Sequence, residues 1–351
     1  MTMPHPSTSV SLYRYHLPLV QPMRFSWGEV RRREGLLVRY IAGDAVGWGE
    51  AAPLPEYSPD TLEEAERALF MGLESWRERL MGGTLVPPPL PGGLPPSARM
   101  ALSDAFRDAA FSRSEPQSLP SHIDIASLLT AADPSELRRE TERAMAGGAC
   151  RAVKLKVGGR PVADDLLRVQ TVARGLSSRT TLRLDANRAW SMREATAFWD
   201  GVQTLGIVPE FIEEPTADPT EWAELEAKGM SLAFDETLRH WTPDTFPHWR
   251  RATAVVLKPT ILGGYDATVK WIEVAHAHNV APVLSGCFES GVGHRMVALA
   301  AAQTVAPAGL GTYRALADDV LTDRLSLDGD SARPHLFLGG SVDLEKLTRI
   351  A

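Results

Sequence analysis

The stretch AVKLKVGGRPVADDLLRVQTVARGLSSRTTLRLDAN (152–187) holds a short apolar run, a helical segment and a second apolar run. Charged residues, Lys156 and Asp185, stand near the ends of the two apolar runs, and the segment between them has the helical period. A parallel strand that is covered on both faces should be apolar throughout. The order of strand, helix and strand predicts a parallel α/β unit, and a charge at the end of each strand requires an explanation.

The same unit recurs from His122 onward. Helical segments separate eight strand candidates: HIDIASL (122–128), CRAVKLKVG (150–158), TTLRLDAN (180–187), EFIEEP (210–215), SLAFDE (231–236), TAVVLKP (253–259), APVLSG (281–286) and GLGTY (309–313). Eight such units predict a (β/α)8-type barrel over residues 121–313. Catalytic groups in this fold lie at the C-terminal ends of the strands. Five charged residues, 22 to 29 residues apart, fall there: Lys156, Asp185, Glu213, Asp235 and Lys258.

The N-terminal third has a different pattern, which predicts an α+β domain over residues 1–120. Residues 8–50 alternate like strands, and helical periods follow over residues 60–80 and 97–111. The polar and basic segment Arg24–Gly35 is predicted to be a long loop between the first two strands. The tail 314–351 lacks a partner strand in the barrel, so we expect part of it to pack back on the N-terminal domain.

The strand period of two predicts which side chains enter the barrel. Lys154 and Lys156 share one face of their strand, and Arg183, Asp185 and Asn187 share one face of the next. Each strand can therefore direct its polar set inward and its bulky aliphatic residues toward the helices.

Three carboxylates flanked by lysines predict a site for a hard divalent cation. Such ions take carboxylate oxygens, and water or substrate oxygens complete their coordination. No His or Cys stands at a corresponding strand end, which favours Mg²⁺ or Mn²⁺ over zinc. A cation of this kind can hold a substrate carboxylate and stabilise the charge that develops when the adjacent C–H is deprotonated. A lysine can be the base if nearby positive charge or desolvation lowers its pKa.

Composition excludes several other classes of protein. The formal net charge of −7 argues against a nucleic-acid-binding surface. No apolar stretch is long enough to predict a membrane span, and the N-terminus MTMPHPSTSV does not resemble a signal peptide. The two cysteines, Cys150 and Cys287, are far apart in the sequence, which favours a reducing, cytoplasmic setting over a disulfide framework. We therefore expect a small-molecule carboxylate substrate, and the sequence leaves the oligomeric state open.

These residues resemble the muconate lactonizing subgroup of the enolase superfamily, over nearly the whole chain. The motifs that carry the resemblance are K-x-K (154–156), D-x-N (185–187), E-E-P (213–215), D-E (235–236) and K-P-T (258–260). Within the subgroup, three segments resemble the o-succinylbenzoate synthase family: RLDANRAW (183–190), GWGEAAPLP (47–55) and SGCFESGVG (285–293). The last segment departs from that family, which more often has a Ser-Ser run and a Leu before the final Gly.

The resemblance implies an enolase-like fold, in which the N-terminal domain caps the barrel, and a role for each site residue. Asp185, Glu213 and Asp235 would bind Mg²⁺, Lys156 would remove the proton α to the substrate carboxylate, and Lys258 would stabilise the enediolate. Lys154 would help to keep Lys156 deprotonated. The implied reaction is the syn dehydration of 2-succinyl-6-hydroxy-2,4-cyclohexadiene-1-carboxylate in menaquinone biosynthesis. Neighbours that would orient the ligands or lie near the substrate are Arg183, Asn187, Glu236, Ser285, Glu289 and Ser290.

Several alternatives stay open at this point. An N-acylamino acid racemase or a dipeptide epimerase of the same subgroup would use Lys156 and Lys258 as two bases, and a non-catalytic metal-binding barrel is a further possibility. Glu289 and Ser290 could simply cap the helix that follows Gly291. Arg31–Arg33 could attract an anionic substrate or lie in a solvated loop.

Overall fold

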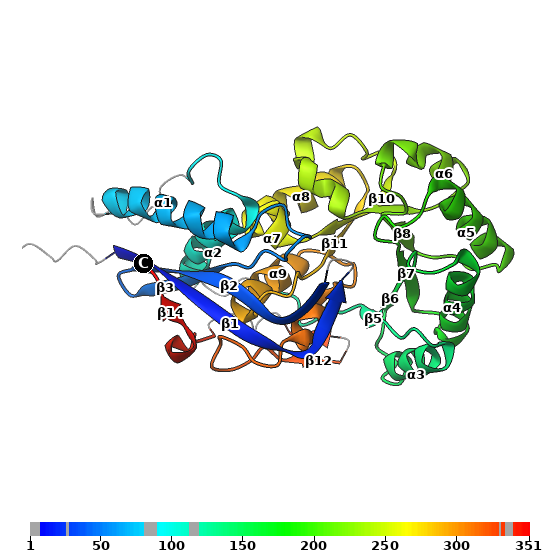
Figure 1. Cartoon of the computed structure of the whole chain (residues 1–351), viewed down its shortest axis with the longest axis horizontal. Coiled ribbons are helices and arrows are strands. Elements are labelled where there is room, and N and C mark those ends of the chain that lie inside the picture. The colour runs from blue at the N-terminus through cyan, green and yellow to red at the C-terminus, as the bar shows by residue number, and fades with distance from the viewer. Residues whose placement is uncertain (1–7, 26–27, 81–89, 112–118, 330, 334–339) are drawn as a thin grey trace, which may run out of the picture.

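The computed structural model describes residues 8–25, 28–80, 90–111, 119–329, 331–333 and 340–351. Figure 1 shows two parts, an N-terminal sheet with its helices and a larger barrel around which helices are arranged. The parallel sheet and the separate N-terminal part confirm the predicted fold class.

The N-terminal part is a four-stranded sheet of order β14-β1-β2-β3 with two helices against it. Its neighbours in the sheet pair antiparallel. The elements are β1 (Thr8–Phe25), β2 (Gly28–Ala42), β3 (Ala45–Ala51), α1 (Leu62–Leu80), α2 (Pro96–Phe111) and, from the C-terminal tail, β14 (Thr348–Arg349). Gly47 and Gly49 allow α2 to lie directly on β3, since a Cβ at either position would stand 2.0 Å from a backbone oxygen of α2.

The predicted loop Arg24–Gly35 is wrong, because β1 continues to Phe25 and β2 begins at Gly28. The two strands pair along this arm, with a register shift between Pro18 and Met23. The arm is polar because much of it is exposed, so it shows no apolar alternation that would reveal a strand. Its charges pair at i and i+2, one pair on each face of β2: Arg31 with Glu29 and Arg32 with Glu34, each at 2.6 Å.

The barrel is a curled parallel sheet of order β11-β10-β9-β8-β7-β6-β5, with helices outside it (Figure 1). Its strands are β5 (Ser127–Leu129), β6 (Ala152–Lys156), β7 (Thr181–Asp185), β8 (Phe211–Glu213), β9 (Leu232–Phe234), β10 (Ala252–Leu257) and β11 (Ala281–Leu284). The helices are α3 (Pro134–Met145), α4 (Val162–Gly175), α5 (Met192–Thr204), α6 (Ala223–Ala227), α7 (Pro259–Leu262), α8 (Tyr265–Ala277) and α9 (Gly291–Ala301).

Short elements complete the described chain. Three 3₁₀ turns lie between strands and helices of the barrel: η1 (Pro219–Trp222), η2 (Glu236–His240) and η3 (Pro243–Thr245). Two more follow α9, η4 (Leu310–Ala315) and η6 (Leu344–Lys346). A small antiparallel sheet joins β4 (Ile123–Asp124) to β12 (Leu327–Asp328) and β13 (Ser331–Ala332). No helix in the described part of the chain combines the length and apolarity that a bilayer span requires.

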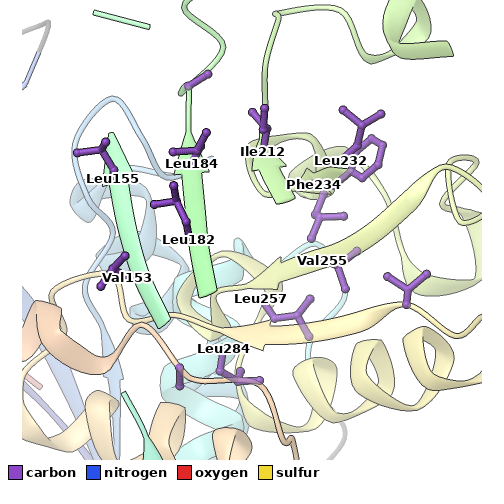
Figure 2. Packing of buried hydrophobic residues seen from close by; sticks show 14 of the residues in the cluster. Val153, Leu155, Leu182, Leu184, Ile212, Leu232, Phe234, Val255, Leu257 and Leu284 are labelled. Carbon is purple, nitrogen blue, oxygen red and sulfur yellow. The ribbon is translucent and has the colours of Figure 1, made fainter. Parts of the chain in front are cut away.

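The strand residues divide between two apolar clusters, as their period of two requires. Figure 2 shows members of the larger cluster, such as Leu155, Leu184 and Leu257 on the strands, which pack with apolar residues of the surrounding helices. The smaller cluster holds the alternate strand residues Phe211, Ala233, Ala254, Val256 and Val283. On their strands, these residues stand two or four positions before Glu213, Asp235 or Lys258, or share their alternation. The three charged side chains therefore lie on the same, inner face of the sheet.

The predicted eighth strand over 309–313 is wrong in its position and length. Residues Leu310–Ala315 form η4, and only Ala308 and Gly309 bridge the gap in the sheet. Gly309 N donates to Leu284 O at 2.7 Å on one side, and Ala126 N donates to Ala308 O at 2.9 Å on the other. Backbone hydrogen bonds therefore cross the gap between β11 and the β4–β5 segment without a regular strand.

Asp104 on α2 should make the stability of the fold depend on pH. Its side chain is buried and accepts from Tyr265 N, at 2.9 Å, at the start of α8. Burial raises the pKa of this carboxyl to about 7 from its ordinary value of 3.8. Between these two pH values the unfolded chain ionises Asp104 while the folded chain keeps it protonated, so stability should fall as pH rises.

Asp104→Asn should remove this loss of stability at high pH, because an amide does not ionise. We expect the free energy of unfolding of the variant, relative to the unaltered chain, to be higher at pH 8 than at pH 5 by on the order of a few kcal/mol. Urea unfolding at both pH values measures it, and Asp266→Asn, a half-exposed carboxylate at the same interface, is the matched control. Equal differences at both pH values would contradict the prediction.

Candidate active site at the barrel mouth

Five consecutive strands of the sheet carry the five charged residues at their C-terminal ends. Lys156, Asp185 and Glu213 are the last residues of β6, β7 and β8, and they are direct partners in the parallel register. Asp235 and Lys258 follow the last residues of β9 and β10. The sheet order β6-β7-β8-β9-β10 therefore places the three carboxylates side by side, with one lysine-bearing strand on either side of them.

Lys154 joins two of the carboxylates. Its ammonium lies 2.8 Å from Asp185 Oδ2 and 2.6 Å from Glu213 Oε2. Burial alone would lower the pKa of Lys154, but the charges of Asp185 and Glu213 outweigh it and raise that pKa. Lys154 therefore stays cationic, and it is the one charged group in the set that touches two carboxylates.

Lys258 and Asp235 form the second ion pair of the mouth. The same ammonium donates to the phenol oxygen of Tyr57 at 2.6 Å, and that phenol donates to Asp235 Oδ2 at 3.1 Å. Tyr57 belongs to the N-terminal domain, from the loop that follows β3. The N-terminal domain thus contributes a side chain to the charged row.

Burial and mutual repulsion set the protonation of the carboxylates. Burial, together with the charges of Asp185 and Asp235, raises the pKa of Glu213 to about 7 despite its contact with Lys154. Burial also acts to raise the pKa of Asp185, but the charges of Lys154 and Lys156 outweigh burial and lower it. The neighbouring carboxyl Glu236 has a raised pKa, again through burial first and then the charge of Asp235. Burial and mutual repulsion therefore oppose full ionisation of these carboxyl groups, and the lysines beside them offset their negative charge.

Lys156 differs from the other lysines of the row because it is exposed. It stands two strand residues beyond Lys154, at the rim of the mouth, where its charge acts on Asp185. An exposed amine at this position can reach a bound molecule, whereas Lys154 is committed to the carboxylates.

Asn187 and Glu214 orient the carboxylates through the backbone and through hydrogen bonds. The backbone N–H of Asn187 donates to Asp185 Oδ1 at 3.0 Å, and its side-chain amide donates to Glu236 Oε1 at 3.3 Å. Glu214 accepts from Asp235 N at 2.9 Å and from the N–H and hydroxyl of Thr237. Glu214 therefore fixes the backbone at the end of the next strand, and its side chain is fully buried.

Arg183 contacts none of the three carboxylates in the described hydrogen bonds and ion pairs, and its guanidinium lies deeper in the barrel. Its guanidinium binds Glu210 at 2.8 Å and donates to Pro307 O at 2.6 Å. Arg183 shares the inner face with Asp185, but two strand residues separate them by about 6.6 Å along the strand. It therefore binds groups at the opposite end of the barrel.

Glu289 and Ser290 are buried and make structural hydrogen bonds, as the helix-cap alternative for this segment expects. Glu289 accepts from Thr260 Oγ1 and from Cys287 N, and no part of its side chain is exposed. Ser290 caps α9 by accepting from Val292 N. Ser285, at the end of β11, is half-buried and is the member of this loop that stays near the mouth.

Two buried charged residues of the N-terminal domain hold this loop in place. Glu50 accepts from Ser290 N at 2.8 Å, from Gly293 N at 2.7 Å and from the hydroxyl of Tyr15. Arg33 donates to Ala52 O at 2.6 Å and to Phe288 O at 3.2 Å. Arg33 therefore joins the loop after β11 to the loop that carries Tyr57.

No local pattern in the sequence identifies Tyr57 as part of the site, or predicts the contacts that Glu50 and Arg33 make. Their partners lie far away in the sequence, and Arg33 stands beside two arginines that are exposed. Glu50 lies in the segment GWGEAAPLP (47–55), which resembles the o-succinylbenzoate synthase family, and Arg33 lies in the basic run Arg31–Arg33.

The donor set suits a hard divalent cation, although the side chains are not gathered around one point. Within the residues that the structure describes, no three His, Cys, Asp or Glu side chains form a ready-made cluster for a metal ion. The ammonium groups of Lys154 and Lys258 lie against these carboxylates, and Lys154 takes the place of a cation between Asp185 and Glu213. Carboxylate oxygens that already bind a positive group fit Mg²⁺ chemically.

Comparison with known proteins gives two family matches and several similar structures. Residues 136–338 match the model described as "Enolase C-terminal domain-like", and residues 7–99 match "MenC, N-terminal domain". The chain is 33% identical over 297 residues to o-succinylbenzoate synthase of Pasteurella multocida (strain Pm70), which covers 83% of this chain and 85% of that protein.

Solved structures agree on the fold. The muconate lactonizing enzyme from Pseudomonas fluorescens, complexed with muconolactone, has a TM-score of 0.78 at 19% identity and covers 97% of this chain and 98% of that one. The L-Ala-D/L-Glu epimerase from Bacillus subtilis has a TM-score of 0.76 at 23% identity and covers 95% and 97% of the two chains. These likenesses establish the architecture and leave the reaction to the site.

Glu50→Gln should loosen the loop after β11 without touching the charged row. An amide in place of the carboxylate offers one acceptor oxygen to a set of donors that occupies both oxygens of Glu50. We expect a loss of about 2–4 kcal/mol in the free energy of unfolding, because buried donors lose their acceptor. Urea unfolding measures it, with Glu63→Gln, an exposed residue of α1, as the control. A loss no larger than that of the control would contradict the role of Glu50.

Proposed function

The chain belongs to the o-succinylbenzoate synthase family of the enolase superfamily, and from this we propose that it dehydrates 2-succinyl-6-hydroxy-2,4-cyclohexadiene-1-carboxylate to o-succinylbenzoate. The observation that carries the proposal is the row of three buried carboxylates between two lysine-bearing strands at the barrel mouth. The reaction makes the enzyme a hydro-lyase of menaquinone biosynthesis.

Asp185, Glu213 and Asp235 are the residues that we propose as ligands of Mg²⁺, for which Mn²⁺ could substitute. The bound cation would supply a Lewis acid for the ring carboxylate of the substrate and so increase the acidity of the neighbouring C–H. The protein's part is to hold the three carboxylates, through Asn187 and Glu214, in a buried row. For Mg²⁺ to bind there, the ammonium of Lys154 would have to move away from Asp185 and Glu213.

Lys156 is the proposed acid–base group. Its neutral amine takes the proton from the carbon next to the ring carboxylate, and the electron pair of that C–H bond moves into the carboxylate. Lys258, on the other side of the row, stabilises the resulting negative charge with its ammonium. The C–O bond of the hydroxyl then breaks, Lys156 returns the proton to it, water leaves, and the ring becomes aromatic.

The runner-up is an N-acylamino acid racemase, which would use both lysines for proton transfer. The same row of residues would serve that reaction, so the substrate decides between the two. Dehydration consumes the ring chromophore of the substrate, whereas racemization of an N-succinylamino acid changes optical rotation only. Assays of the purified protein with both substrates separate the proposals.

Removal of the cation should abolish turnover. Three neighbouring carboxylates that lose their counter-charge repel one another, so a chelator should stop the reaction, and Mg²⁺ or Mn²⁺ should restore it. Asp185→Asn, Glu213→Gln and Asp235→Asn should each reduce Mg²⁺ affinity by about 100-fold or more, which calorimetry measures. Glu210→Gln, a carboxylate at the opposite end of the barrel, should leave that affinity unchanged. Full turnover by exhaustively metal-free protein would exclude this role for the carboxylates.

The two lysines should differ in their effects. Lys156→Ala should lose essentially all dehydration and also the exchange of the α-proton with solvent deuterium, because no other group is proposed to move that proton. Lys258→Arg keeps a positive charge with a different shape, so a small fraction of the activity should remain. Absorbance and ¹H NMR follow the two processes. If both variants still exchanged the α-proton of one enantiomer of an N-succinylamino acid, the racemase would be the better assignment.

A further inference from the structure

We propose that Tyr57, from the N-terminal domain, is a positioning residue that holds the ammonium of Lys258 in its working place. The inference rests on the proposed function, since it concerns the lysine that stabilises charge in that reaction. Tyr57 is the residue of the N-terminal domain that reaches both Lys258 and a proposed metal ligand through one oxygen atom.

The hydrogen bonds at this oxygen have a defined direction. A phenol has one proton to donate, an ammonium has three and accepts none, and a carboxylate only accepts. Lys258 Nζ therefore donates to Tyr57 at 2.6 Å, and Tyr57 donates to Asp235 at 3.1 Å. Among the described contacts, the ammonium uses two of its three N–H groups, on Tyr57 and Asp235. The third is left for a bound substrate.

Tyr57 is the partner of Lys258 that has no other duty in the proposed reaction. Asp235 would be shared with the cation, so its hold on the ammonium would weaken, whereas the neutral phenol would keep its hold. The side chain of Lys258 has four rotatable bonds, and its restraint by Tyr57 reduces the number of positions the ammonium takes. A fixed charge close to the developing negative charge contributes most to the rate.

The loop that carries Tyr57 is held from both sides. Ser58 N donates to Leu54 O at 2.8 Å, which closes a turn around Tyr57. Arg239, from η2 of the barrel, donates to Tyr57 O at 3.2 Å, and its guanidinium lies 5.6 Å from the centre of the ring. Arg33 binds the carbonyl oxygens of Ala52 and Pro53 at the start of the loop. These contacts fix the phenol relative to the strand ends.

Tyr57→Phe removes the hydroxyl and keeps the ring, over which Lys258 Nζ lies at 5.0 Å from the centroid. We expect kcat to fall by about 10- to 100-fold while KM changes by less than about three-fold, because the interaction acts on the charge formed during the reaction. Tyr265→Phe is the matched control: it removes a phenol that accepts from Gln303, away from the mouth. The control should keep the kcat and KM of the unaltered chain.

A second measurement does not depend on turnover. In protein labelled with ¹⁵N-lysine, the side-chain signal of Lys258, identified by its loss in Lys258→Arg, should shift in Tyr57→Phe and stay in place in Tyr265→Phe. If the unaltered chain fails to dehydrate the substrate, the proposed function is wrong. The shift of the Lys258 signal still tests the contact between Tyr57 and Lys258 in that case. An unshifted signal overturns the inference, and so does an unchanged kcat in an active protein.

The pattern of the kinetic loss separates positioning from packing. A rise in KM as large as the fall in kcat, or a lowered unfolding midpoint, would mean that Tyr57 serves the loop alone and would overturn the inference. If Tyr57→Phe did not fold, Arg239→Gln would take its place as the test, since it releases the same loop from the barrel side. It should lower kcat by a smaller factor and shift the Lys258 signal in the same direction.

Discussion

The row of buried carboxylates across the barrel mouth is the constraint on which the rest of the structure depends. Parallel pairing sets the ends of neighbouring strands about 5 Å apart, so Asp185, Glu213 and Asp235 cannot avoid one another. Carboxylates that lose water and face like charges need cations or donors close by. Lys154 and Lys258 supply those cations from strands on either side of the row, so the protein can fold before any metal binds.

The same constraint gives the N-terminal domain its part in the site. Within the barrel, the ammonium of Lys258 has Asp235 as its partner. The loop after β11 leads into the N-terminus of α9, whose backbone N–H groups need acceptors. Tyr57 binds the ammonium of Lys258, and Glu50 accepts hydrogen bonds at the start of α9. Glu50 lies in β3 and Tyr57 in the short segment that follows it. Because Arg33 binds this segment and Phe288 together, a shift of the N-terminal domain would move both loops of the mouth at once.

The sequence pattern predicted those parts of the molecule that depend on residues close together in the chain. The period of two identified the inward-facing residues of β6 and β7, and the recurring strand and helix identified the barrel. It failed for the arm of β1 and β2, where an exposed ribbon has no apolar face, and for the eighth strand, which is reduced to Ala308 and Gly309. Tyr57 and Glu50 could not be predicted, because their partners are 178 and 240 residues away and no periodicity links them.

The shortened eighth strand also explains why the N-terminal domain docks where it does. The helix before it, α9, is buried along its whole length, whereas a barrel helix normally exposes its outer face. Its sequence, GVGHRMVALAA, is accordingly apolar on most sides, and Gly293 N in its first turn donates to Glu50 from β3. Regular strand pairing is weakest between β11 and β5, and the N-terminal sheet covers the helix beside that gap. The two domains are therefore joined where the barrel by itself is least complete, and the loop after β11, which Glu50 and Arg33 bind, lies at that joint.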